Sequence, residues 1–255
     1  MNWDDRMLLY RIQNLLTWFV LISVTAVSWW IMTMPSILWS DGELDINKFF
    51  MHVMMHPADM TTYLTVTASM WMVMMIAMMV PVVLPTGIVF RQVYKGTQTN
   101  RASLLFFSGY LFVWFVFALM AACLQYLANI MGYLQAGSFS LKAILAGLLL
   151  ILAGLYQLSP MKEMCLRHCQ SPLGFFIGNW RDGLLGASIM GARHGLYCVG
   201  CCWMLMLLMF AGGTMSLLTM SALCFFMLFE RVLSGYIAAI PAILMMVAGF
   251  WILLL

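Results

Sequence analysis

Long apolar stretches recur along the chain, and seven of them have lengths close to that of a membrane-spanning helix. A helix needs about 20 mostly apolar residues to cross the hydrocarbon core of a bilayer. We predict spans at residues 14–34, 62–84, 104–127, 142–158, 189–211, 214–229 and 236–255. The sequence therefore predicts an all-α fold, a polytopic transmembrane helical bundle with about seven spans.

The composition indicates lipid rather than water as the solvent. Of the 255 residues, 64% are hydrophobic and 8% are charged, whereas soluble domains carry about 25% charged residues. The net charge of +3 is too small and too dispersed for binding along a nucleic-acid backbone. These figures argue against a soluble enzyme, a disordered chain and a nucleic-acid partner. We expect residues 1–255 to form a single transmembrane domain.

Positive charges fall mainly on one side of the predicted spans. With a cytoplasmic N-terminus, ten of the 12 Lys and Arg residues lie in cytoplasmic segments, and only Lys48 and Lys142 lie outside. Cytoplasmic loops of membrane proteins are enriched in these residues. We therefore predict an N-in, C-out protein of the plasma membrane (the bacterial inner membrane), with residues 35–60 as an external loop.

Five of the seven cysteines lie between residues 165 and 202. Cys165 and Cys169 are four residues apart, so they share one helix face. Cys198 lies three residues before Cys201 and four before Cys202, which places it on a shared face with each of them. The two sets belong to consecutive elements joined on the cytoplasmic side, so we expect that they converge. The candidate metal ligands of this inner group are Cys165, His168, Cys169, His194, Cys198, Cys201 and Cys202.

Several chemistries fit this inner group. Thiols and thioethers are soft ligands that select Cu(I), and a closed shell of four ligands suits zinc. Cys198 and Cys201 also form a C-x-x-C pair, which is typical of a redox dithiol. Buried cysteine is in addition a common packing residue. Spacing alone leaves copper, zinc, an iron–sulfur cluster and thiol redox chemistry open, and the 27 Met residues favour copper.

A second candidate metal group lies in the predicted external loop. On a helix His52, Met55, His56 and Asp59 would share one face, although Pro57 disfavours helix at the residue before it. Thioethers do not form disulfides, so a Met/His site suits copper in an oxidising compartment. A solvated interfacial loop is the alternative.

Methionines also form stripes on the predicted span at 62–84. Met70, Met74 and Met78 are spaced four residues apart and therefore share one helix face. Such stripes usually serve packing, because Met is a flexible filler of irregular cores. The functional alternative is a thioether ladder through Met74 and Met78, leading a soft cation from the outer group to the inner one.

Two polar residues fall at or just inside the predicted span at 189–211. Arg193 and His194 would be costly in lipid unless they are paired or functional. Asp182 and Glu230 are candidate partners for them. The alternative is that Arg193 extends its guanidinium to the cytoplasmic interface.

The cysteine-rich segments resemble a known family. The resemblance rests on the stretch from Tyr156 to Lys162, on Cys165-Leu166-Arg167-His168-Cys169, on Trp180-Arg181 and on the stretch from His194 to Trp203. It extends to Trp71, Met74, Met78 and Pro81, and it is specific over 71–85 and 156–211. The sequence is similar here to the largely uncharacterised predicted metal-binding integral membrane proteins. In place of that family's Glu-Lys pair, this chain has Glu230-Arg231.

The resemblance implies a polytopic membrane protein with a metal site at the five clustered cysteines, with His168 and His194 nearby. Our leading hypothesis is a membrane protein that handles a soft metal, Cu(I) rather than zinc, in transport, delivery or storage. Its partners would be lipid, a metal chaperone or subunits of a membrane complex. The alternatives are an accessory subunit of a larger membrane enzyme complex and a membrane thiol oxidoreductase. The sequence carries none of the phosphate-binding or hydrolase motifs, so we favour a non-enzymatic role.

Overall fold

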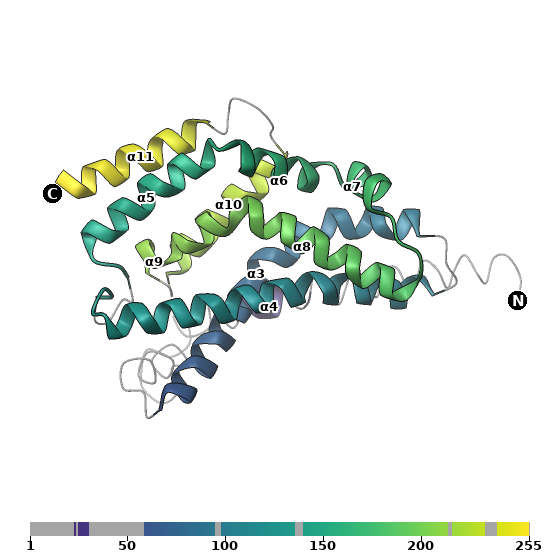
Figure 1. The fold of residues 1–255 in the computed structure, drawn as a ribbon, viewed down its shortest axis with the longest axis horizontal. Helices are drawn as coiled ribbons and strands as arrows, with labels where there is room; N and C mark the ends of the chain where they lie inside the picture. The colour runs from purple at the N-terminus through teal and green to yellow at the C-terminus, as the bar shows by residue number, and fades with distance from the viewer. Residues whose placement is uncertain are drawn as a thin grey trace, which may run out of the picture.

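The computed structural model describes residues 23, 25–30, 59–94, 98–135, 140–213, 216–232 and 239–254 (Figure 1). Residues 23 and 25–30 are helical. The further helices are α3 (Met60–Val93), α4 (Thr99–Ile130), α5 (Ala143–Gln157), α6 (Pro160–Gln170), α7 (Pro172–Asn179), α8 (Gly183–Leu207), α9 (Met209–Gly212), α10 (Leu217–Val232) and α11 (Ala239–Leu254). The described residues form no strand, and an isolated bridge joins Leu134 to Leu141. The all-α prediction is confirmed.

Three helical segments are long and apolar enough to cross a membrane, namely α3, α4 and the segment Gly183–Gly212. The helices α5 and α6 pass the same test as a pair, but they are bent by 65° at the break between them. The helices α10 and α11 have 16 residues each. The described residues therefore support three spans, or four with the bent pair, and the remaining predicted spans stay predictions.

The helix α3 continues beyond the predicted span end at residue 84, through both internal prolines. Pro81 has no N–H to donate to the carbonyl of Ala77, four residues earlier. The indole of Trp29 donates to that carbonyl instead, at 3.0 Å. Buried helices tolerate proline where a neighbour satisfies the freed carbonyl, so the helix extends to Val93.

Small residues set the spacing of α4 and α8. A Cβ atom at Gly109 would overlap the backbone oxygen of Ser188, and one at Gly191 would overlap that of Phe106. Glycine therefore lets the two backbones approach closely, as in membrane helix pairs. Near the other end of the molecule, α5 and α11 lie side by side, with Gly147 packed against Gly249 (Figure 1). The helices α3, α6, α8 and α10 all contribute residues around the clustered cysteines.

Candidate metal centre

The short helix α6 carries the first pair of cysteines. Its start is fixed by Ser159, whose hydroxyl accepts a hydrogen bond from the backbone N–H of Lys162 at 3.2 Å, and by Pro160 in the first turn. Serine before proline is a common helix start, because it caps a free N–H while proline needs none. The bend after α5 turns α6 against α8, which brings Cys169 into a buried position.

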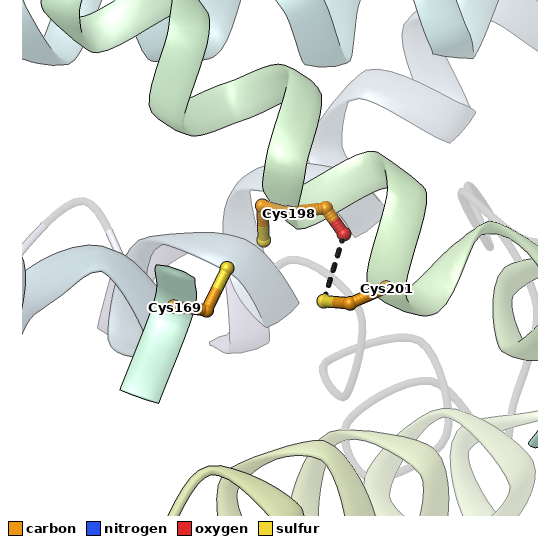
Figure 2. Close-up of side chains that lie close together, drawn as sticks. All are labelled: Cys169, Cys198 and Cys201. Carbon is orange, nitrogen blue, oxygen red and sulfur yellow. Dashed lines mark hydrogen bonds between the residues drawn. The ribbon is translucent and has the colours of Figure 1, made fainter. Parts of the chain in front are cut away.

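The second set of cysteines lies on α8, where Cys198 and Cys201 share one face. The sulfur atoms of Cys169, Cys198 and Cys201 all lie within 4.8 Å of one another, and all three side chains are buried. Figure 2 shows Cys169 on α6 and the other two on α8, with their sulfur atoms facing a common space. We call these three residues the thiol triad.

The spacing of the thiol triad suits a single soft metal ion. Thiolates bind zinc at about 2.3 Å, and three sulfurs at that distance in one plane around an ion are about 4.0 Å apart. The observed limit of 4.8 Å allows this arrangement with small side-chain rotations. Three thiolates around one ion form a soft donor set of the kind that selects Cu(I).

The thiols of α8 are hydrogen-bonded donors. Those of Cys201 and Cys202 donate to the backbone carbonyl of Cys198, at 3.1 Å and 2.9 Å. The hydroxyl of Tyr110 on α4 lies 3.3 Å from the sulfur of Cys198. Metal binding requires thiolates, so an ion bound by the triad would displace the proton of Cys201 and release its sulfur from the carbonyl. Cys202 lies beside the triad as a fourth buried thiol.

A small cavity adjoins the thiol triad. Four helices contribute to its wall, and four kinds of side chain meet there: thiols, thioethers, aliphatic groups and charged groups. The lining residues are Met79, Val82, Leu166, Cys169, Cys198, Cys201, Cys202, Met227, Glu230 and Arg231.

A buried ion pair holds α6 against α10 beside this cavity. Lys162 Nζ lies 2.5 Å from Glu230 Oε1, and both side chains are almost completely buried. The amide of Gln157 also donates to this carboxylate, and Gln170 donates to the Glu230 backbone carbonyl at 2.9 Å. Buried charges need such partners, because removal from water costs several kcal/mol per ion.

Arg231 supplies a positive charge at the same cavity. Its guanidinium donates to the carbonyl of Val82 and to the hydroxyl of Thr86, the latter at 2.6 Å. Three thiolates around one monovalent cation would carry a net charge of −2, so a guanidinium among the cavity-lining groups would stabilise such a state.

Two of the predicted ligands on α6 lie outside the triad. Cys165 is partly exposed, and its sulfur lies 2.7 Å from the position that a Cβ atom at Gly200 would occupy. His168 stacks on Tyr197, with ring centroids 4.3 Å apart and planes 2° from parallel. Both side chains therefore serve the contact between α6 and α8 in this structure, and their role as ligands stays a prediction.

His194 lies one turn before Cys198 on α8 and is completely buried. Its Nε2 is 3.3 Å from the hydroxyl of Thr86, and its ring packs against that of Phe175. The structure does not bring this imidazole into the group of three sulfurs.

The remaining predicted ligands are placed differently. His52, Met55 and His56 lie outside the described residues. Met74 and Met78, on α3, are buried in the hydrophobic core of the bundle and are not among the cavity-lining residues. A thioether role for these two positions stays a prediction.

The predicted partners of Arg193 and His194 are wrong. Arg193 donates to the side-chain oxygen of Asn179 at 3.1 Å. Asp182 accepts from Trp180 at 2.8 Å, and Glu230 pairs with Lys162 from another helix. The sequence did contain a signal for this pair, because a lone Glu at the end of a predicted span needs a buried partner. Nothing in the sequence identified Lys162 as that partner.

The site thus belongs to a helical protein that gathers buried thiols from two neighbouring helices. A family model described as "PpoB2: Copper chaperone" matches residues 68–252, and the chain belongs to this family. The matched region is longer than the segments 71–85 and 156–211 that carry the resemblance to metal-binding membrane proteins. It supports the expectation that the chain belongs to a metal-related family. No curated protein and no solved structure matches the chain.

Proposed function

We propose that this protein binds Cu(I) as cargo at Cys169, Cys198 and Cys201 and delivers it to a partner. The observation that carries the proposal is the approach of three buried sulfur atoms to within 4.8 Å in a member of a copper chaperone family. A buried, soft, anionic site excludes water and harder ions while it holds Cu(I). Delivery is the role that the family description favours over transport or storage.

Zinc is the competing ion. A structural zinc site is closed by four ligands, and Cys202 lies close enough to the triad to line the same cavity. The sulfur of Cys202 is not part of the group within 4.8 Å. A site of three close thiolates therefore favours Cu(I), which accepts fewer ligands than zinc.

We also propose that the chain is an integral membrane protein. Three helices meet the length and hydropathy needed for a span. Large apolar side chains remain exposed along the helices, among them Phe112, Phe250 and Trp251, each at least 60% exposed. A water-soluble monomer rarely exposes apolar area on this scale. The seven spans, the single domain, the N-in orientation and the plasma membrane belong to this proposal.

The geometry favours metal binding over thiol exchange with proteins. A dithiol oxidoreductase needs a thiol that a partner's disulfide can reach. In the C-x-x-C pair, Cys198 is 1% exposed and Cys201 is 8% exposed. Both face the interior of the bundle, where a metal ion fits and a second protein does not.

The test is the copper content of purified protein loaded anaerobically with Cu(I). We expect roughly one tightly held ion per chain in the wild type, as one soft site requires, and loss of that ion in C198S/C201S. The control variant C123S/C165S removes two thiols outside the triad and should keep its copper. A parallel loading with zinc decides between the two ions.

Equal copper in C198S/C201S and in the control would contradict the proposal. Copper bound with the same affinity by all three proteins would place the ion elsewhere in the molecule. Zinc retained in preference to Cu(I) would overturn the choice of ion. Circular dichroism of each variant shows whether a loss of copper reflects a loss of fold.

A further inference from the structure

Two methionines line the same cavity as the thiol triad. Cys169 lies on α6 and Cys198 and Cys201 lie on α8, while Met79 on α3 and Met227 on α10 are further soft donors among the lining residues. Both methionines are buried, with exposed fractions of 0% and 6%. Of the many core methionines of the described residues, these two line the cavity.

Met79 lies next to the triad. The hydroxyl of Tyr110 is 3.3 Å from the backbone oxygen of Met79 and 3.3 Å from the sulfur of Cys198. Met227 lies one turn before Glu230, which is bound to Lys162 of α6. Tyr110 thus links α3 to α8, and the ion pair links α10 to α6, so each methionine-bearing helix is joined to a helix that carries triad cysteines.

Thioethers and thiols differ in protonation and hydrogen bonding before a metal ion binds. Within the triad, the thiol of Cys201 donates a hydrogen bond to the backbone carbonyl of Cys198, so it must lose its proton and leave that carbonyl before it binds. A methionine sulfur is neutral, carries no proton and is flexible. A thioether can therefore coordinate Cu(I) without a preceding deprotonation, whereas a thiol cannot.

We propose that Met79 and Met227 form a transient Cu(I) site through which the ion passes to and from the thiol triad. This inference rests on the proposed function. The copper stays Cu(I) throughout, and no electrons are exchanged. Binding to the two thioethers releases no proton. As the ion passes to the triad, each of the three thiols gives one proton to water and becomes a thiolate, and it takes a proton back when the ion leaves.

The test compares M79L/M227L with a matched control, M75L/M220L. Leucine has nearly the volume of methionine, and such exchanges usually cost less than about 1.5 kcal/mol. Met75 and Met220 lie on the same two helices and are equally buried, with exposed fractions of 0% and 2%, but they do not line the cavity. Copper is supplied as Cu(I)–glutathione and withdrawn by bathocuproine disulfonate, with the rates followed by stopped flow.

We expect M79L/M227L to load and release Cu(I) at least about tenfold more slowly than the wild type, because only neutral thioethers accept the ion without proton loss. Its equilibrium affinity should stay within about threefold, because the thiolates hold the ion. The control should match the wild type in both quantities. Equal rates in the two double variants would overturn the inference, as would a loss of affinity as large as the loss of rate. A wild type that binds no Cu(I) would instead refute the proposed function.

Discussion

Two stretches of α8 are built differently. In the first, Gly191 and Gly195 lie against α4, and the two backbones pack so closely that a Cβ atom at Gly191 would overlap the backbone of Phe106. In the next turns, Cys198 and Cys201 line a cavity, and the Cys198 sulfur also lies 3.3 Å from the hydroxyl of Tyr110 on α4. The first stretch has no space for a ligand, whereas the second presents thiols to a cavity.

The attachment of the partner helices differs in the same way. The helix α4 is held against α8 by close backbone contact at Phe106 and Gly109. The helix α6 has only 11 residues, and polar links hold it: Lys162 to Glu230, Gln170 to the Glu230 carbonyl, and Tyr156, just before α6, to the Gly200 carbonyl. The site therefore lies between a closely packed helix pair and a short helix that buried polar side chains hold in place.

Removal of the buried ion pair gives the largest expected effect. Lys162→Met leaves Glu230 as an uncompensated buried charge, which typically costs about 3–5 kcal/mol in the free energy of unfolding. Denaturant unfolding of the purified protein in detergent measures the loss. K162M/E230M should recover most of it, because a buried pair replaced by apolar residues is often close to neutral.

The control for this change lies in the same helix. Arg167 pairs with Glu163 at 2.6 Å, but both side chains are largely exposed, and such pairs contribute about 0–1 kcal/mol. Arg167→Met should therefore leave the free energy of unfolding nearly unchanged. Equal losses in K162M and R167M would show that the polar links do not hold α6 in place.

The fold class and the grouping of thiols were accessible from the sequence, and the reason is periodicity. Apolar stretches of spanning length predicted α3, α4 and the core of α8, because burial in lipid imposes length. The spacing of Cys198, Cys201 and Cys202 placed them on one face of α8. The helix α8 begins at Gly183, six residues before the predicted span start at 189, because Asp182 is its N-cap and the helix already includes the six residues before the apolar span.

The partners across helices were not accessible from the sequence. Which methionine meets the thiols depends on the rotation and crossing of α3, and the stripe through Met74 and Met78 gave no sign that Met79 lines the cavity. The pairing of Lys162 with Glu230 joins residues 68 positions apart. His168 adjoins Cys169 in sequence, yet the 3.6-residue period of a helix turns it towards Tyr197 instead.

Close packing on the α4 side of α8 predicts an effect of intermediate size. Gly191→Ala forces the backbones of α8 and α4 apart at Phe106, and overpacking of this kind costs about 1–3 kcal/mol. Thermal unfolding in detergent measures it. Gly178→Ala on α7 is the control, because nothing lies within 4 Å of the added methyl group. A G191A protein as stable as G178A would show that α4 and α8 separate freely, which would remove the contrast between the two stretches of α8.

The smallest expected effect concerns the aromatic contact on the α6 side. His168→Ala removes the stack on Tyr197, and aromatic pairs contribute about 0.5–1.5 kcal/mol beyond their buried area. The free energy of unfolding should fall by that amount, while the Cu(I) content stays that of the wild type. His168→Phe keeps a ring in place without nitrogen donors and should preserve both quantities. If His168 were a ligand, H168F would lose copper as fully as H168A does, and the metal site would then reach from the buried triad to the outer face of α6.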